Sequence, residues 1–449
     1  MTAHAAAIDG ASLSLLWAAP FAGVLLTIAL APLLAARWWH PHYEKAAAFW
    51  ALATIGPMMA AYGAEATATA IFHTLALEYA PFIIMLFALF TTAGGLLIRG
   101  GATGRPLSNA LVLAFGAVIA NAIGTMGAAM ILLRPLLRAN ASRRRNAHVA
   151  VFFIFLVANI GGVLTPLGDP PLFLGFLRGV DFFWPARNLL APMAFAAGVL
   201  LAIFIAIDCW LWSREETLPD IDGENFSVGG KINLALLAIA VGAIAVSGVW
   251  TPGSGFTILG VRLETQNVVR DVLLIAVGLA SLALTPTQIR AATGFEWAPL
   301  LEVAILFAAI FICITPVVAM LNAGADGAFG PLVALTSRPD GGANNIVFFW
   351  LSGLLSGFLD SAPAYLVFFE IAGGDPVALM GPQAPTLVAI SLGTVFLGGL
   401  TYIGNAPNFI VYAIARDAGV RMPGFFGYLL WAAVFLLPLF GAVTYLFIR

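Results

Sequence analysis

Long apolar segments alternate with short polar loops along the whole chain. Most of these segments approach the roughly 20 residues that a helix needs to cross the hydrocarbon core of a membrane. A porin-type barrel would instead show short segments in which apolar and polar residues alternate. The pattern therefore predicts an all-α, polytopic membrane protein. The predicted spans and half-spans are 13–36, 46–62, 81–98, 107–121, 128–137, 147–164, 171–177, 189–212, 232–250, 272–284, 299–321, 346–371, 387–400 and 425–448.

Composition supports this fold class. Of the 449 residues, 61% are hydrophobic and only 9% are charged, and a soluble domain could not bury so much apolar surface. The formal net charge is −2 and no domain is basic, which gives no indication of a nucleic-acid partner. The expected partner is the lipid bilayer.

A polar segment near the middle of the chain, residues 213–231, carries charges of both signs. It links an N-terminal membrane half, residues 1–212, to a C-terminal half, residues 232–449, and we expect the two halves to form a single membrane unit. Arginine-rich loops usually face the cytoplasm, which places residues 37–45, 99–105 and 138–145 and the linker on the inner side.

Two ten-residue segments, 164–173 and 400–409, are near copies of each other. They are identical at five positions, and both interrupt apolar runs with Gly, Pro and polar residues. Matching helix interruptions in the two halves of a membrane protein indicate a transport site. The sequence thus predicts one discontinuous helix in each half.

The two segments lie 236 residues apart, and the same shift relates a second pair of interruptions. It places residues 124–127 (Gly-Thr-Met-Gly) on residues 360–363 (Asp-Ser-Ala-Pro). Each tetrad divides an apolar stretch that is too short on either side to cross the bilayer, so each is expected to form the tip of a re-entrant hairpin. Residues 78–82 also resemble residues 296–300, and each is expected to open a long span. These two spans would run in opposite directions, which predicts two inverted-topology repeats.

The four interruptions collect polar side chains at membrane depth. An acid at the centre of a spanning helix costs roughly 2.5 to 3.5 kcal/mol, so Asp169 and Asp360 are candidates for a cation or proton site. The alternative is that each caps the helix that follows its interruption. Carbonyl ends of broken helices suit Na⁺, and N–H ends suit carboxylates. The candidate ion- and substrate-binding residues are Thr125, Gly127, Thr165, Gly168, Asp169, Asp360, Ser361, Pro363, Thr401, Gly404, Asn405 and Asn408.

Five further polar residues are ambiguous. Arg134 and Glu370 correspond under the 236-residue shift, and we expect them either to form a charge pair or to reach the membrane interface separately. Glu302 has no counterpart in the other half and is explained equally well by a structural role. Asn121 and Asn159 are expected to link helices by hydrogen bonds.

The sequence has no pattern that is typical of an enzyme. Its five histidines lack the spacing of metal ligands, and it contains no Gly-rich phosphate-binding loop and no nucleophile elbow. We therefore expect no enzymatic activity and no cofactor. The metal expected at the site is transported or coupling Na⁺, with H⁺ as the other ion.

Residues 124–135, 159–173, 360–363 and 400–409 resemble the ion transporter superfamily. This superfamily includes arsenite pumps, NhaD-type sodium/proton antiporters, and citrate and divalent-anion symporters. The resemblance implies two inverted repeats, each with a re-entrant hairpin and a discontinuous helix. It also implies a homodimer in the bacterial inner membrane. The sequence Ser-Asn-Thr, which the sodium/anion symporters carry at their hairpin tips, is absent here.

Two functional hypotheses follow. In the first, the protein is a secondary transporter that exchanges sodium for protons, with Asp169 and Asp360 binding Na⁺ or H⁺ in turn. In the second, it transports citrate or another small carboxylate together with Na⁺ or H⁺. Helix N-termini, the hairpin-tip hydroxyls, Asn405 and Asn408 would then bind the anion.

Overall fold

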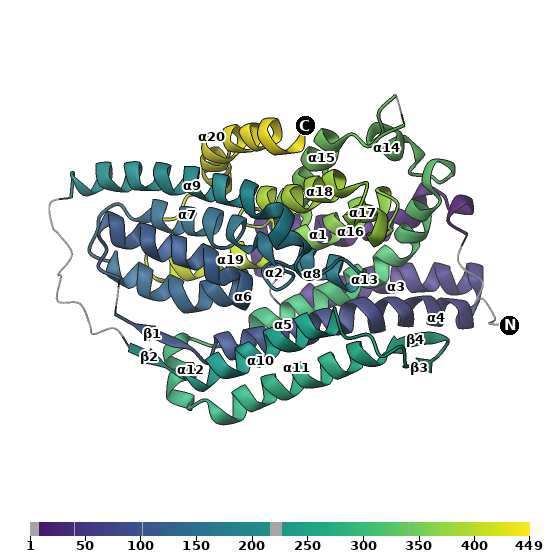
Figure 1. The fold of residues 1–449 in the computed structure, drawn as a ribbon, viewed down its shortest axis with the longest axis horizontal. Helices are drawn as coiled ribbons and strands as arrows, with labels where there is room; N and C mark the ends of the chain where they lie inside the picture. The colour runs from purple at the N-terminus through teal and green to yellow at the C-terminus, as the bar shows by residue number, and fades with distance from the viewer. Residues whose placement is uncertain (1–8, 40, 101, 216–226, 340) are drawn as a thin grey trace.

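The computed structural model describes residues 9–39, 41–100, 102–215, 227–339 and 341–449. These residues form a bundle of helices with two short strand pairs (Figure 1). Eight helices in this part of the chain are apolar and long enough to cross a membrane. The predicted polytopic helical fold is therefore confirmed, and the strand pairs are an addition that the all-α prediction did not include.

Short helical pieces, labelled η, separate or extend the longer helices. The elements of the N-terminal half are η1 (Gly10–Ser12), η2 (Leu15–Ala18), α1 (Ala19–Leu34), α2 (Ala36–Trp39), α3 (Tyr43–Tyr62), α4 (Ala64–Thr74), η3 (Leu75–Tyr79), α5 (Ala80–Ala93), β1 (Leu97–Arg99), α6 (Pro106–Ala139), α7 (Ala147–Leu156), η4 (Ile160–Leu164), α8 (Pro170–Leu177) and α9 (Trp184–Trp212). The elements that follow are β2 (Ser227–Gly229), α10 (Ile232–Ser247), β3 (Gly255–Ile258), β4 (Val261–Glu264), α11 (Thr265–Leu284), α12 (Thr287–Thr293), α13 (Ala298–Asn322), η5 (Gly324–Asp326), α14 (Gly330–Leu335), α15 (Asn345–Leu359), α16 (Ser361–Ile371), α17 (Pro376–Met380), α18 (Ala384–Leu397), η6 (Gly398–Leu400), α19 (Ala406–Asp417), α20 (Phe425–Val443) and η7 (Thr444–Ile448).

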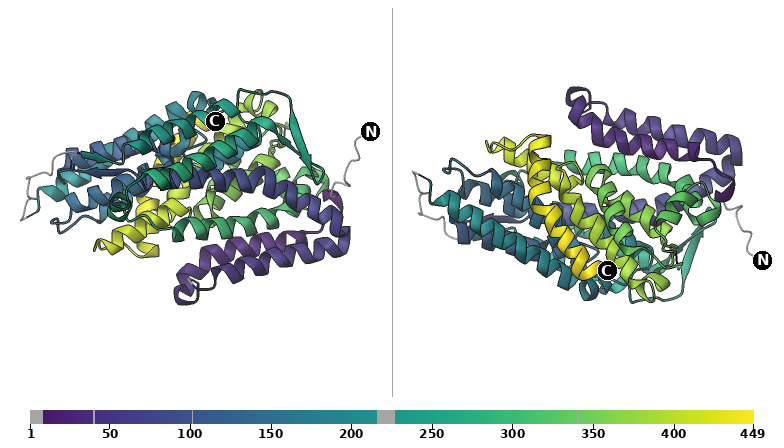
Figure 2. Two further views of the ribbon diagram at one scale, coloured as in Figure 1. Left: turned by 90° about the horizontal axis from the view of Figure 1, so that it is seen from below. Right: turned by 90° about the horizontal axis from the view of Figure 1, so that it is seen from above.

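The first helices form an outer layer. α1 and α3 lie together at one edge of the molecule in both views of Figure 2. Large apolar side chains on these two helices are exposed, among them Leu30, Phe49 and Leu52. Apolar surface of this kind is suited to lipid, as expected for spans at the edge of a membrane protein.

The stretch before Pro81 corrects the sequence prediction. α4, η3 and α5 form one continuous 30-residue helix, Ala64–Ala93, although the sequence predicted a gap between residues 62 and 81 and a span that opens at residues 78–82. η3 is a π-helical turn, and the Ala80 N–H bonds the carbonyl of Leu75. Pro81 has no N–H and cannot donate a hydrogen bond within the helix. The widened turn accommodates this missing bond, so the helix continues through the proline. The predicted counterpart at residues 296–300 does open a helix, α13.

α6 folds back on itself at Gly124. The side chains of Asn109 and Asn140, near its two ends, exchange hydrogen bonds of 2.9 and 2.8 Å. These residues are 31 positions apart, and a straight helix would separate them by roughly 45 Å. The reversal occurs at Gly124, whose φ of 77° and ψ of 155° are strained for any residue with a side chain. The two arms of α6 are therefore antiparallel.

α15 and α16 fold back in the same way at Asp360. The rings of Phe348 and Phe368 lie 6.2 Å apart, although a straight helix would separate them by roughly 30 Å. Asp360 has a φ of 99°, which is unusual for a residue other than glycine. Gly124 and Asp360 are related by the 236-residue shift, so the two reversals occupy corresponding positions.

The two predicted helix interruptions are also present. α7, η4 and α8 are separated by non-helical residues around Thr165, and α18, η6 and α19 are separated around Thr401. The Thr165 hydroxyl donates to the carbonyl of Asn121, and the Thr401 hydroxyl donates to the carbonyl of Gly357. Both partners of the second bond lie 236 residues after those of the first. The same contact is therefore repeated in the two halves.

The two halves pack directly against each other. α5 and α13 are antiparallel, because Tyr79 makes an edge-on ring contact with Phe311 while Phe87, later in the chain, stacks on Trp297, which is earlier in the chain than Phe311. β1, which precedes α6, and α14, which precedes α15, lie at opposite ends of the molecule (Figure 1). Most of the predicted linker, residues 216–226, lies outside the described residues, while β2 at its end pairs antiparallel with β1.

Candidate ion and substrate site

Asp169 lies in the first helix interruption, immediately before α8. Its side chain is 1% exposed, and its Oδ1 atom accepts a long hydrogen bond of 3.5 Å from the Thr125 hydroxyl. Its Oδ2 atom is buried and has no hydrogen-bond partner among the described residues. The carboxylate makes no capping hydrogen bond to α8, so a helix cap does not explain this acid.

Glycines bring the first hairpin tip against the first interruption. The Thr125 N–H donates to the carbonyl of Gly168 at 3.0 Å. A Cβ atom on Gly168 would lie 2.0 Å from the carbonyl oxygen of Gly162, and one on Gly127 would lie 3.1 Å from the side chain of Ala93. Gly168 therefore permits an approach between two backbone segments that a larger residue would prevent.

Asp360 has a different environment at the second hairpin tip. Its carboxylate caps α16 by accepting the Ala362 N–H at 3.0 Å, as the capping alternative predicted. The residue is half-buried and also lines a cavity of about 120 Å³ together with Glu302, Asn405 and Trp39. The capping role and a place at a cavity therefore coexist in this acid.

Two other predicted residues of this tip lie beside Asp360. The Ser361 hydroxyl is fully buried and has no hydrogen-bond partner among the described residues. Pro363 is the third residue of α16 and lies in its first turn. N–H groups in the first turn have no acceptor within the helix, so a proline there costs no hydrogen bond.

The two halves of the site meet at the centre of the molecule. Asp169 and Asp360 immediately precede α8 and α16, and these two helices pack side by side. A second cavity, of about 30 Å³, is lined by Thr125 and Gly168 of the first half and by Pro407 of the second. The structure therefore brings together the candidate residues of both hairpins and both interruptions.

Three amides connect the interruptions across the two halves. The Asn159 side chain donates to Asn408 Oδ1 at 2.7 Å and accepts from Asn405 at 3.0 Å. Asn405 also caps α19 by accepting the Asn408 N–H, and the Asn408 amide donates to the carbonyls of Gly398 and Thr401. All three amides are thus hydrogen-bonded to protein. Gly404, like Gly168, packs tightly, since its Cβ would lie 2.5 Å from the carbonyl oxygen of Gly398.

The cavity of about 120 Å³ is acidic, because Asp360 and Glu302 both line it. Glu302, for which the sequence gave no partner, accepts a hydrogen bond of 3.2 Å from the Trp39 indole and faces the same cavity as Asp360. No Lys, Arg or His is among the described residues that line either central cavity. Among the described residues, no cluster of three or more His, Cys, Asp or Glu could hold a metal ion.

The predicted pair of Arg134 and Glu370 is wrong. Glu370 forms an ion pair with Arg178, which also pairs with Glu78 at 2.8 Å. Arg134 instead packs against Gly294 at the end of α12. Arg134 and Glu370 occupy corresponding positions in the two repeats, but they lie in different surroundings. Residues at corresponding positions are therefore not in contact here.

The sequence did not single out a second buried polar cluster, at the base of the α6 hairpin. Asp208 is fully buried in α9, pairs with Arg143, and accepts hydrogen bonds of 2.9 Å from His148 and from Asn109. A lone acid within the apolar run of α9 was the available signal. These contacts join α9 to α6, to the loop after α6 and to α7, which indicates that Asp208 fixes the ends of the hairpin.

Comparisons with known proteins agree with this architecture. Residues 10–448 match the family described as "Putative citrate transport". An uncharacterized transporter of Mycobacterium bovis and another of Mycobacterium tuberculosis are each 25% identical to this chain over 327 residues, which is 71% of this chain and 71% of each relative. Because the family match extends over nearly the whole sequence, the chain belongs to the family described as "Putative citrate transport", and it is a membrane transporter rather than an enzyme.

Proposed function

We propose that this protein is a secondary transporter in which Asp169 and Asp360 bind Na⁺ or H⁺ in turn. One observation carries the proposal: Asp360 lines a central cavity whose described lining contains no basic side chain, and Asp169 of the opposite half begins the helix that packs beside α16. One oxygen of Asp169 also has no partner among the described residues.

Two ionised carboxylates at this depth repel each other, and each is costly to remove from water. One bound cation relieves both effects. Asp169 Oδ2 and the hydroxyls of Thr125 and Ser361 offer the oxygen ligands that Na⁺ requires, and a proton on either acid removes its charge. Since Na⁺ and H⁺ would compete for the same carboxylates, their movements would be coupled.

We also propose that the two halves are inverted repeats with re-entrant hairpins. The antiparallel packing of α5 and α13, the contacts repeated at a spacing of 236 residues, and the positions of β1 and α14 at opposite ends support this arrangement. Alternating access would then expose the central acids first to one end of the molecule and then to the other.

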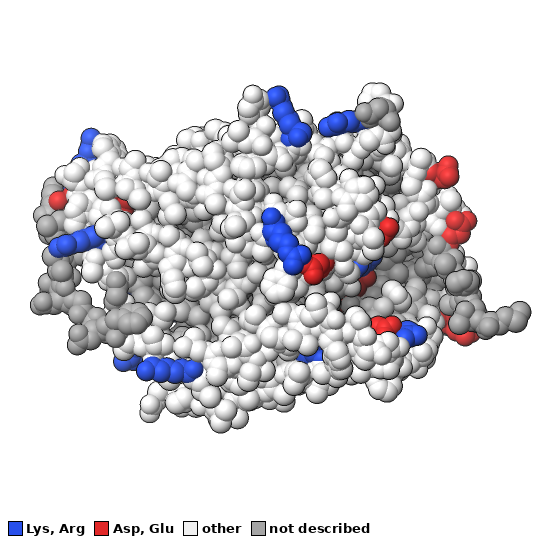
Figure 3. Space-filling model, in the orientation of Figure 1, with Lys and Arg blue, Asp and Glu red and all other residues white. Residues whose placement is uncertain are grey.

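Charge supports an orientation in the membrane. Acidic side chains gather toward the right-hand end of the face shown in Figure 3, whereas β1, which ends at Arg99, and the arginine-rich loop 138–145 lie at the other end. We propose that the arginine-rich end faces the cytoplasm and that the membrane is the bacterial inner membrane. The homodimer stays a prediction that rests on the family resemblance.

Carboxylate transport is the second candidate, and the description of the family favours it. A citrate anion beside Asp360 and Glu302 would be repelled unless a cation lay between them. In this alternative, Na⁺ or H⁺ on the central acids would have to bind before or together with the anion. The two candidates therefore share the same acidic cation site.

Flux measurements in proteoliposomes test the first candidate. We expect the wild-type protein to move protons out of the vesicles when a gradient drives Na⁺ in, and to move protons in when a gradient drives Na⁺ out. Asp169→Asn and Asp360→Asn should each abolish this exchange, because an amide neither carries the compensating charge nor takes up a proton. The matched control is Asp417→Asn, which changes an exposed acid at the end of α19 and should leave the exchange intact. Normal exchange in both central variants would refute the proposal.

A second set of vesicles separates the two candidates. Labelled citrate and a panel of dicarboxylates are added outside vesicles under an inward Na⁺ or H⁺ gradient. If one of these carboxylates accumulates in wild-type vesicles but not in Asp360→Asn vesicles, the protein transports carboxylates. The proposal of sodium/proton exchange alone would then be replaced. If ion exchange proceeds without any carboxylate, sodium/proton antiport is supported.

A further inference from the structure

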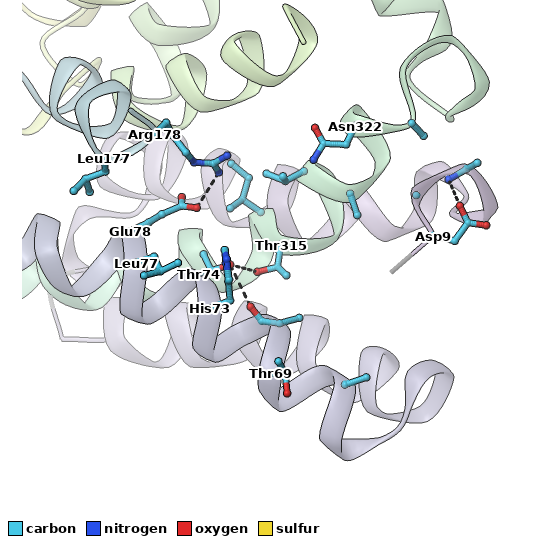
Figure 4. A pocket seen from close by; sticks show the side chains of 18 of the residues that line it. Asp9, Thr69, His73, Thr74, Leu77, Glu78, Leu177, Arg178, Thr315 and Asn322 are labelled. Carbon is cyan, nitrogen blue, oxygen red and sulfur yellow. Dashed lines mark hydrogen bonds and ion pairs between the residues drawn. The ribbon is translucent and has the colours of Figure 1, made fainter. Parts of the chain in front are cut away.

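A large cavity lies on the acidic side of the molecule, away from the central acids. Its volume is about 1000 Å³, and residues of α4, η3 and the end of α13 line it. Glu78 and Arg178 face each other at one end of this cavity, while Asn322 and Asp9 lie toward the other (Figure 4). Asp9 and Asp326, which also lines the cavity, are exposed, so the cavity is in contact with solvent there.

Glu78 and Arg178 line this cavity and form a triad, Glu78–Arg178–Glu370, with Glu370 behind them. The Arg178 Nη2 atom lies 2.8 Å from Glu78 Oε1, and its Nη1 atom contacts Glu370 Oε1. Both acids are buried, with exposed fractions of 6% and 4%. Arg178, which is partly exposed, therefore pairs with two carboxylates at once.

The triad has one more negative charge than positive charge when both acids are ionised. Glu78 Oε2 is buried and has no hydrogen-bond partner among the described residues, so the Arg178 that contacts Oε1 is shared between this carboxylate and Glu370. Uncompensated buried charge is strongly unfavourable. Among the described residues that line the cavity, His73 on α4 is the other titratable group near Arg178, while Asp9 and Asp326 add further negative charge. These charges favour uptake of a single positive charge by the triad.

The triad also joins two helices that begin at the central acids. α8 begins directly after Asp169 and ends directly before Arg178, and α16 begins directly after Asp360 and carries Glu370 in its last turn. The two helices pack side by side, and a Cβ on Gly175 of α8 would lie only 2.3 Å from the Tyr365 hydroxyl of α16. A change in the triad would thus act on the same two helices that position the central site.

We propose that the Glu78–Arg178–Glu370 triad is a proton-binding site, separate from the central acids, and that its proton keeps the far ends of α8 and α16 docked together. The proton comes from the cavity and binds to one carboxylate, while the other carboxylate stays paired with Arg178. Loss of this proton leaves two carboxylates competing for one guanidinium and weakens the docking. The second part of this proposal rests on the proposed transport function, whereas the proton site does not.

Infrared difference spectroscopy of the purified protein tests the proton site directly. Protonated carboxyl groups give a C=O band that is distinct from the bands of carboxylates and shifts in D₂O. At neutral pH we expect Glu78→Gln to lose one such band relative to wild type. Glu370→Gln should lose the same band, because the remaining carboxylate then pairs with Arg178 and has no reason to keep a proton. Asp326→Asn, an exposed acid on the same cavity, is the control and should retain the band.

Two outcomes would overturn the proposal. If both glutamine variants keep every protonated-carboxyl band of the wild type, the triad holds no proton. If only one variant loses a band, one acid keeps its proton even without the other acid, and competition for Arg178 does not explain the protonation. Because this measurement requires no transport, it stands even if the central acids prove not to exchange Na⁺ for H⁺. Eluting each variant from a sizing column with the wild-type profile establishes that it is folded.

A flux measurement tests the coupling to α8 and α16. The rate of Na⁺-dependent exchange should depend on the pH of the side that the cavity faces. In Glu78→Gln and Glu370→Gln this dependence should be lost, while Asp326→Asn should keep it. An unchanged pH profile in both glutamine variants would show that the proton of the triad does not influence transport through α8 and α16. The existence of the proton site would then be decided by the infrared measurement alone.

Discussion

The close packing of Gly168 gives a quantitative prediction. In Gly168→Ala, the new methyl group would lie 2.0 Å from the carbonyl oxygen of Gly162, whereas real Cβ atoms almost never approach within 3.0 Å. The two backbone segments must therefore separate by about 1 Å or more, since backbone atoms cannot rotate away. This shift would also stretch the 3.0 Å hydrogen bond from the Thr125 N–H to Gly168. Overpacking and the lost hydrogen bond together should cost about 2 to 4 kcal/mol of folding free energy.

The assay is equilibrium unfolding in mixed detergent micelles, followed by tryptophan fluorescence, together with Na⁺-dependent flux. Gly198→Ala is the matched control, because nothing lies within 4 Å of the added methyl group. Gly198 lies within α9, so Gly198→Ala should leave the folding free energy unchanged or stabilise the protein by up to about 1 kcal/mol. In Gly168→Ala, Asp169 would move together with the adjacent backbone, so flux should fall as well. Equal stability and equal flux in the two alanine variants would refute the role assigned to this contact.

Three further predictions follow from other contacts. Asp208→Asn should cost about 3 to 5 kcal/mol by leaving the guanidinium of a buried ion pair uncompensated, and an unfolding free energy equal to that of Asp417→Asn would contradict this. Asn159→Ala removes two hydrogen bonds between the halves at once and should lower Na⁺-dependent flux by about tenfold, whereas unchanged flux would make these amides dispensable. Arg144→Cys and Asp326→Cys, in a background without the native cysteines, should react with an impermeant thiol reagent from opposite sides of the membrane. Labelling of both from the same side would exclude the proposed orientation.

The interruptions of the helices could be predicted because they are local. Glycine, proline and polar residues within apolar runs marked the breaks around Thr165 and Thr401, and the structure has them at these places. A single shift of 236 residues then located the reversals at Gly124 and Asp360. Local composition and internal repetition were sufficient for these features, since neither depends on a distant partner.

The continuous helix Ala64–Ala93 could not be predicted in the same way. Proline is common in the first turn of a helix, so the sequence predicts that Pro81 opens a span. The structure accommodates Pro81 with a π-helical turn and pairs Glu78 with Arg178, which is 100 residues away in sequence. Both solutions depend on tertiary contacts that a single sequence does not display.

The same limit applies to the charged and amide pairs of the site. Glu370 pairs with Arg178 and not with its repeat counterpart, and Asn159 contacts Asn405 and Asn408 rather than only its own neighbours. Repeat symmetry relates equivalent residues, but contacts at the boundary between repeats join residues that are not equivalent. Partners of this kind are visible only in three dimensions.

Ion binding by the purified protein tests the central claim most directly. Addition of Na⁺ to the protein in weakly buffered detergent should release protons, because Na⁺ displaces H⁺ from Asp169 and Asp360. We predict that Asp169→Asn and Asp360→Asn each lose this release while Asp417→Asn retains it. Proton release that persists in both central variants, or that is absent from the wild-type protein across the range of pH in which it is folded, would contradict the account.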